Sequence, residues 1–224
     1  VCIGKLILSG YKMKYYKDKR RVIAVLIAVI LMGFSLSFLI RVNFGTDPAS
    51  TMNLGIAKKL GISFGLWQVL FNGLLLIVVI ILDRSQIGIG TLANMVLIGY
   101  SSDLFTWLFD MVIPEGMFVD ENFIPRVLVL IPSLILFIFA AATYMSVELG
   151  TSAYDAVAFI IADKFDKKYF RIIRICYDVA AAVIGYLLGS TIGIVTVVVA
   201  FALGPVIALV KEKLDKYFSK VEAV

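Results

Sequence analysis

The sequence predicts an all-α membrane protein with six transmembrane helices, built as two three-helix repeats of inverted topology. Each repeat is expected to carry a short broken or re-entrant helix after its first span. The composition predicts the class, since 61% of the 224 residues are hydrophobic and only 17% are charged. Apolar runs of about 20 residues recur, which is the length that crosses the hydrocarbon core of a bilayer. A short motif also occurs twice, 105 residues apart (150 − 45), and each copy interrupts an apolar run.

The repeated motif reads GTDPAS at residues 45–50 and GTSAYD at residues 150–155. In both copies a residue with a short oxygen-bearing side chain, Asp47 or Ser152, precedes a new apolar-periodic stretch. Such residues cap helix N-termini, and proline is tolerated directly after the cap because the N–H that it lacks would be unpaired there. Ser152 followed by Asp155 also resembles a capping box, with aspartate in the usual Glu or Gln place. The motif therefore predicts two helices that begin at matching places.

The apolar runs and their breaks predict each element in order. The expected spans cover residues 22–42, 64–82, 87–109, 124–147, 169–188 and 192–210. The short helices, 48–60 and 152–165, cannot cross a bilayer and must lie in the interface, re-enter or pack against protein. The first dozen residues, before Met13, are set aside in predicting the fold. The resulting segments are a basic arm (1–21), a first repeat (22–109), an acidic external connection (110–123), a second repeat (124–210) and a charged tail (211–224).

The two halves match beyond the opening motif. At the same offset of 105, IGIGT at residues 87–91 faces IGIVT at 192–196, and Gly99 faces Gly204. Glycines and threonines at one fixed offset indicate an internal repeat better than aliphatic matches do. Because each half holds an odd number of spans, the halves must cross the membrane in opposite directions, which is a common plan for transporters.

The distribution of Lys and Arg tests the orientation, because these residues concentrate on the cytoplasmic side. With the N-terminus inside, the cytoplasmic segments hold 16: seven in residues 1–21, one at Arg84, four in 164–171 and four in the tail. The external segments hold four, at Arg41, Lys58, Lys59 and Arg126. The bias predicts a multi-pass protein of the bacterial inner (plasma) membrane with both termini cytoplasmic. Lys58 and Lys59 do not fit an ordinary external loop, so the first short helix is either anchored by packing or dips back.

Several function classes are disfavoured. The chain has no histidine and two distant cysteines, and it shows no metal-binding cluster, P-loop or dinucleotide fingerprint. We therefore expect no enzyme, no cofactor and no metal site. The net charge of +5 lies beside apolar segments without a nucleic-acid-binding motif, so it is interpreted as orientation in the membrane.

Polar residues within the apolar spans are the candidate site, because ionisable groups at bilayer depth are costly. Arg174 and Asp178 are four residues apart on one helical face, where each can neutralise the other. Gln68 and Asn72 occupy the matching positions of the second span. A structural ion pair that fixes helix packing and a solute- or proton-linked pair that lines a cavity both fit this pattern.

The two motif loops supply the other candidates, since helix N-termini within the membrane present free N–H groups to anionic solutes. Ordinary helix capping explains the two acids of the loops equally well. Trp67 and Trp107, near span ends, are interpreted as interface anchors. The candidate solute-binding residues are Thr46, Asp47, Gln68, Asn72, Thr151, Ser152, Asp155, Arg174 and Asp178.

The segments NFGTDP (residues 43–48), IGIGT (87–91) and GTSAYD (150–155) resemble the short YczE-like members of the bacterial YczE/YyaS/YitT membrane-protein family. The resemblance covers about residues 20–210. It implies a polytopic inner-membrane protein with no settled substrate, and one member of that family is linked to control of lipopeptide antibiotic production. The soluble C-terminal domain of the longer YitT-type members has no counterpart in this sequence.

The sequence favours a transporter or channel for a small solute, anionic if the helix N-termini bind it, with a site between the two repeats. One alternative is a membrane regulator or assembly partner that transports nothing. Another is the substrate-binding membrane subunit of a multi-subunit importer, because Ala24 and Ala28 on the first helix have the spacing of a docking face. The expected partners are the lipid bilayer and a small-molecule or ion solute, with a homo-oligomer or a membrane-protein partner left open.

Overall fold

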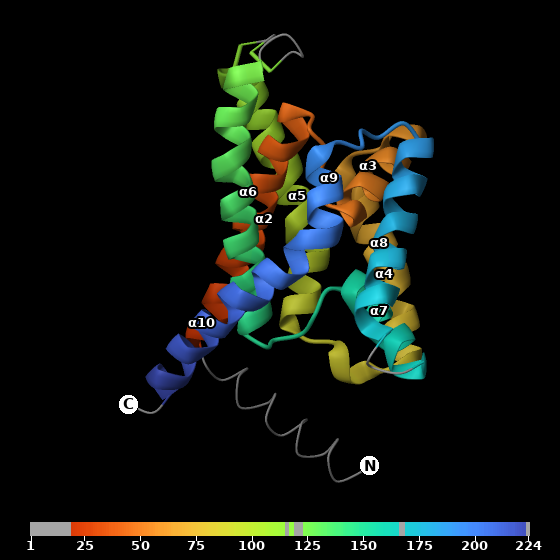
Figure 1. The fold of residues 1–224 in the computed structure, drawn as a ribbon, viewed down its shortest axis with the longest axis vertical. Coiled ribbons are helices and arrows are strands. Elements are labelled where there is room, and N and C mark those ends of the chain that lie inside the picture. The colour runs from red at the N-terminus through yellow and green to blue at the C-terminus, as the bar shows by residue number, and fades with distance from the viewer. Residues whose placement is uncertain (1–18, 115–116, 119–122, 166–168, 223–224) are drawn as a thin grey trace.

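The computed structural model describes residues 19–114, 117–118, 123–165 and 169–222. Most of the basic arm predicted over residues 1–21, much of the acidic connection at 110–123, and Lys167 and Lys168 lie outside these ranges. Helices make up the regular secondary structure of the described residues (Figure 1). The predicted all-α class is therefore confirmed for this part of the chain.

The first half contains α2 (Lys19–Val42), the short α3 (Pro48–Leu60), α4 (Phe64–Leu82), one 3₁₀ turn, η1 (Arg84–Gln86), and α5 (Ile89–Val112). The boundaries of α3 follow from its caps. The Asp47 carboxylate accepts a hydrogen bond from Ser50 N, Pro48 takes the first helical position, and Gly61 ends the helix at φ 69°. Ser63 caps α4 in the same way by accepting from Leu66 N.

The second half contains α6 (Phe123–Ser146), the short α7 (Ala153–Phe165), α8 (Phe170–Leu187), α9 (Ile194–Val198), a π-helical turn, η3 (Val199–Leu203), and α10 (Gly204–Glu222). The span expected over residues 192–210 is bent by 59° between Ile194–Phe201 and Gly204–Lys216. Pro205 explains the break, because it has no N–H to donate within the helix and its ring crowds the preceding turn. The charged segment after Val210, expected as a tail, continues as the helix α10 to Glu222.

The helices gather into two groups that each mix both halves of the chain (Figure 1). We call the first the frame bundle: α2 packs along α5 and α6, and α10 packs on α6. We call the second the hairpin bundle: α3 packs on α8, α4 packs on α7, and each short helix also contacts the helix that follows it. The contact of α4 with α5 and that of α8 with η3 join the two bundles.

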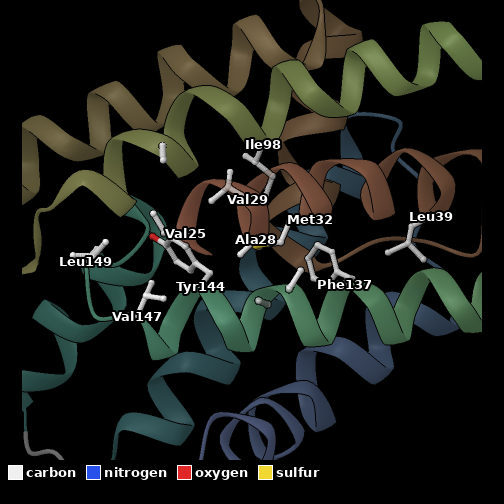
Figure 2. Close-up of a cluster of buried hydrophobic side chains, with 13 residues drawn as sticks. Val25, Ala28, Val29, Met32, Leu39, Ile98, Phe137, Tyr144, Val147 and Leu149 are labelled. Carbon is white, nitrogen blue, oxygen red and sulfur yellow. The ribbon is translucent and has the colours of Figure 1, made fainter. Parts of the chain in front are cut away.

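The largest apolar core lies in the frame bundle, where side chains of α2, α5 and α6 meet (Figure 2). Val25 and Val29 on α2 are fully buried, and Phe137 on α6 is buried beside them. Ala28 packs in the same cluster as the buried Ala140 and Ala141, and such small residues let two helix backbones approach closely. This close packing fixes the first helix of one half against the first helix of the other.

Within the described residues, four helices, α2, α4, α5 and α6, are long and apolar enough to cross a membrane, and the bent pair would add a fifth if it is one span. The six predicted spans are not all recognised by length and composition. The helix α8 is missed because it has 18 residues and carries three charged side chains, Arg171, Arg174 and Asp178. Leucine, isoleucine and valine side chains are exposed along α4, as at Leu70, Leu74 and Ile81. Such apolar outer faces suit a lipid environment.

Candidate functional site

The two motif loops dock across the molecule, each onto the turn of the other half. Phe44 O, beside the first motif, accepts a hydrogen bond from Val195 N at 3.1 Å, and Leu149 O, beside the second, accepts one from Gly90 N at 2.8 Å. The two bonds correspond at the 105-residue offset. In the second loop, Thr91 Oγ1 also donates to Thr151 O at 2.7 Å.

The backbone of these loops also repeats. Asn43 and Glu148 both adopt left-handed φ values, 54° and 55°, and Gly45 and Gly150 follow at 87° and 112°. A Cβ at Gly45 would lie 2.3 Å from Thr196 Oγ1, and one at Gly150 would lie 2.6 Å from Thr91 Oγ1. Only glycine satisfies both the conformation and the close approach, which explains why it begins each motif.

Two buried arginines tie the same loops to the first helix of the opposite half. Arg126, at the start of α6, donates from Nε to Val42 O at 2.8 Å and from a guanidinium nitrogen to Asn43 O at 3.3 Å. Arg21, at the start of α2, donates to Val147 O at 3.2 Å. Because each arginine reaches the carbonyls at the C-terminal end of the other helix, α2 and α6 run antiparallel (Figure 1).

The capping hydrogen bonds predicted for the motif loops are present. Asp47 Oδ1 accepts from Ser50 N at 3.0 Å, and Ser152 Oγ accepts from Asp155 N at 3.0 Å. Thr46 is buried, and its hydroxyl lies 3.0 Å from that of Thr51. These bonds hold the loops themselves, and solute binding by the loop residues stays a prediction.

A charged cluster forms where α7 meets α8. Arg174 Nε donates to Asp178 Oδ2 at 3.0 Å, and a terminal guanidinium nitrogen of Arg174 pairs with Asp155 Oδ1. Tyr154 donates its hydroxyl to Asp178 Oδ1 at 3.0 Å, and the Arg174 guanidinium carbon lies 5.4 Å from the centre of its ring. The Asp155 carboxylate therefore binds Arg174, while the backbone N–H of Asp155 donates the capping hydrogen bond to Ser152 Oγ. One arginine here holds two carboxylates together.

Asp47 adds a third carboxylate to this region. Its Oδ2 oxygen is buried and has no hydrogen-bond partner, whereas Oδ1 is occupied by the helix cap. The charges of Asp155 and Asp178 are close enough to act on it. The start of α3 therefore brings a half-satisfied acid next to the α7–α8 cluster.

Gln68 and Asn72 form a separate amide cluster with α3. Asn53 Nδ2 donates to Gln68 Oε1 at 2.8 Å, and Trp67 Nε1 donates to Asn53 Oδ1 at 3.0 Å. Asn72 donates to Gln68 O within its own helix at 2.9 Å. The expected alignment of Gln68 and Asn72 with Arg174 and Asp178 thus gives two polar clusters, one neutral and one charged, with no hydrogen bond between them among the described residues.

Three contributors to these clusters are absent from the candidates drawn from the sequence. Tyr154 lies inside the repeated motif, where its phenol side chain replaces the methyl group of the matching Ala49. Asn53 is a buried amide on an otherwise apolar stretch of α3, and a lone amide among apolar residues could have marked it as a candidate. Trp67 donates its indole N–H to Asn53, and Trp107 is 54% exposed; their role as interface anchors stays a prediction.

Replacing Thr91 with valine is expected to destabilise the fold by about 1–3 kcal/mol, because it leaves Gly88 N and Thr151 O without their hydroxyl partner in a buried loop. Thermal unfolding of the purified protein in detergent measures the effect. Thr143→Val is the matched control, since its hydroxyl only bonds Phe139 O within one helix, and a change below about 0.5 kcal/mol is expected. Equal stabilities of the two variants would show that the crossed docking contributes little.

Comparison with known proteins places these features in a family. The chain is 26% identical over 137 residues to "Uncharacterized protein YyaS" of Bacillus subtilis, covering 61% of this chain and 66% of YyaS, just under two thirds. It is 22% identical over 183 residues to an "Uncharacterized protein" of Haemophilus influenzae, covering 82% of this chain and 79% of the relative. It is 23% identical over 137 residues to "Uncharacterized membrane protein YczE" of B. subtilis, covering 61% and 60%.

The resemblance to YczE and YyaS inferred from three short motifs is thus confirmed by matches over much longer stretches. No solved structure matches the chain. The name of YczE and the apolar helices together indicate a protein embedded in a membrane by several helices. The match of residues 19–212 to one family model shows that this chain belongs to the "Family of unknown function (DUF6198)".

Proposed function

We propose that the chain is a six-span transporter or channel for a small polar solute, built from two inverted halves with a site at their contact. The observation that carries the proposal is the charged cluster at the start of α7. There Arg174 holds Asp155 and Asp178, near Asp47 at the N-cap of α3, whose Oδ2 oxygen is buried. Charged groups inside an apolar helical protein are costly, and they are typical of substrate or ion pathways.

The crossed contacts support the inverted arrangement. Val195 N to Phe44 O and Gly90 N to Leu149 O are the same interaction made in both directions, which is what a two-fold axis between halves produces. The antiparallel run of α2 and α6 requires that axis to lie near the membrane plane if both helices span. In this arrangement α8 is the fifth span in chain order and brings the total to six. Its Arg174 and Asp178 turn to other protein groups, whereas Arg171 near its start is exposed.

Cysteines placed at Lys59 and Lys164, exposed residues near the ends of α3 and α7 and 105 apart, are expected to label from opposite sides of the membrane. An impermeant maleimide applied to intact cells should modify the cysteine at position 59 and leave the one at 164 unmodified, after Cys2 and Cys176 are replaced by serine. Permeabilising the cells is the control that exposes both. Modification of both from the same side contradicts the inverted arrangement.

The partial exposure of the cluster favours a functional role over a purely structural ion pair. The Arg174 side chain remains 31% exposed and that of Asp155 26%, whereas Asp178 is buried. A guanidinium at bilayer depth avoids lipid and turns to other protein groups or to water. We infer that the open side of Arg174 borders an aqueous space that a solute can enter.

The charge balance narrows the solute class. Asp155 and Asp178 already occupy the guanidinium of Arg174, so little positive charge is left to bind an anion. The cluster offers carboxylate oxygens and the hydroxyl of Tyr154, which suit amines and other hydrogen-bond donors. We therefore propose a neutral or cationic polar solute in place of the anion considered from the helix N-termini alone.

Flux into liposomes that contain the purified protein tests the proposal. Radiolabelled small amines, amino acids, sugars and anions form the panel, and at least one amine or zwitterion is expected to enter faster than into empty liposomes. Arg174→Gln and Asp178→Asn should each reduce that flux at least tenfold. Arg171→Gln, an exposed arginine one turn earlier on α8, is the matched control and should leave it unchanged.

Two other outcomes identify the alternatives. If the whole panel fails and a specific membrane protein co-purifies, the chain is a regulator or assembly partner. If flux appears only with an ATPase present, the chain is the substrate-binding subunit of an importer.

A further inference from the structure

The carboxylate of Asp47 has one oxygen that nothing in its surroundings satisfies. Oδ1 accepts the capping hydrogen bond from Ser50 N at 3.0 Å, while Oδ2 is buried without a donor. A buried polar atom without a partner is rare in folded proteins and asks for an explanation such as an unseen ion or a functional role. This residue begins α3, at the contact between the two halves of the chain.

Three arginines of the surrounding segments bind other groups. Arg41 pairs with Asp110, Arg126 binds the carbonyls of Val42 and Asn43, and Arg174 is shared between Asp155 and Asp178. The elements around Asp47 carry these titratable groups: Arg171, Arg174, Cys176, Tyr177, Asp178 and Tyr186 on α8, Tyr154, Asp155, Asp163 and Lys164 on α7, and Lys58 and Lys59 on α3, whereas α4 and α9 carry none. Two of these groups, Asp155 and Asp178, are carboxylates whose negative charge opposes ionisation of Asp47.

An ionised Asp47 would thus place negative charge on a buried oxygen without a partner, near two other carboxylates that share one arginine. Such a charge is removed either by a bound cation or by a proton. Among the described residues, no three His, Cys, Asp or Glu side chains form a group that could hold a metal ion. A proton needs only the one free oxygen, so it is the simpler way to neutralise the site.

We propose that Asp47 carries an exchangeable proton on Oδ2, and that release and uptake of this proton drive solute movement through the adjacent charged cluster. The first part stands on the contacts of Asp47 itself, and the second part rests on the transport function proposed above. Protonation converts the carboxylate into a neutral acid that keeps Oδ1 free to cap α3. No bond other than the O–H bond forms or breaks.

The second half of the chain shows that a neutral side chain is enough to cap the short helix. Ser152 stands at the matching position and caps α7 through its hydroxyl, a neutral group. Asparagine is also a good N-cap. Asp47→Ser and Asp47→Asn should therefore both preserve the N-cap of α3 while removing the carboxyl group. A variant that folds but lacks the proton can then be told apart from one that does not fold.

Infrared spectra of the purified protein in lipid nanodiscs, recorded over a pH titration, test the proton directly. Wild type is expected to show the carbonyl absorption of a protonated carboxylic acid at neutral pH, and its frequency should shift in D₂O. Asp47→Asn and Asp47→Ser should each lack one such signal. Asp110→Asn, which removes an exposed carboxylate, should retain it, and thermal melting confirms that the variants are folded.

Spectra of the two Asp47 variants that match wild type overturn the proposal. Loss of the wild-type carboxylic-acid signal when sodium chloride replaces choline chloride at constant pH also overturns it, because that result would assign the site to Na⁺. The spectra need no solute, so a failed flux panel would overturn transport and leave the protonated acid measurable. Flux that is as sensitive to a pH gradient in Asp47→Asn as in wild type overturns the coupling alone.

Discussion

Replacing Gly193 with alanine is expected to lower the stability of the fold by about 3 kcal/mol or more, among the largest effects of a single methyl group in this protein. The new Cβ would lie 2.1 Å from Phe44 O and 2.3 Å from Phe44 C, both backbone atoms of the opposite loop. Backbone cannot move aside as a flexible side chain can, and the hydrogen bond between Val195 N and Phe44 O lies in the same contact. The thermal midpoint in detergent should fall by roughly 6–12 °C, at about 2–4 °C per kcal/mol for a chain of this size.

Gly73→Ala is the matched control for this substitution. Gly73 lies inside α4, and a Cβ there would meet nothing within 4 Å. Alanine at that position should stabilise the protein by about 0.5–1 kcal/mol, because glycine loses more backbone entropy in a helix. If Gly193→Ala is as stable as Gly73→Ala, the docking of the first loop onto the second turn does not support the fold.

Arg174→Gln is expected to cost about 2 kcal/mol of stability in addition to its effect on flux. Removal of one partner from a buried ion pair costs more than this, and the figure is reduced here because about a third of the Arg174 side chain is exposed. The loss comes from leaving Asp155 and Asp178 close together without a cation. A second substitution, Asp178→Asn, should restore part of it by removing one of the two charges.

The rescue separates an electrostatic role from simple packing. In a double-mutant cycle, the combined Arg174→Gln and Asp178→Asn protein should be more stable than the sum of the two single effects predicts. Arg171→Gln should change stability by less than about 0.5 kcal/mol, since that side chain is exposed. Additive effects of the pair would mean that Arg174 and Asp178 contribute to stability independently, without an electrostatic interaction between them.

Local signals in the sequence predicted the short helices and the second span closely. The bounds of α3 and α4, Pro48–Leu60 and Phe64–Leu82, match the expected ranges because caps and glycines act on their nearest neighbours. Asp47, Ser63 and Gly61 all perform the terminal roles that their residue types favour. The class and the family could be predicted for a similar reason, since they depend on composition and on short motifs.

What could not be predicted depends on contacts between segments far apart in the chain. The pattern of residues 87–91 and 192–196 revealed a repeat, but nothing local indicated that each turn would hold the loop of the other half. The same limit applies to the polar clusters. The bend before Gly204 differs, because Pro205 is a local signal for it. Gln68 and Arg174 occupy matching places, yet one binds Asn53 and the other binds Asp155, because the partners across each contact differ.

The exchange of loops also sets an order in which the protein can be completed during synthesis. The carbonyl of Phe44 leaves the ribosome long before Gly193 and Val195, which follow it by about 150 residues (193 − 44 and 195 − 44). At about 5–20 residues per second, this carbonyl waits roughly 7–30 s for its partner. The first short helix therefore enters the membrane with its loop unfinished, and the nascent chain closes only when its last apolar segment arrives.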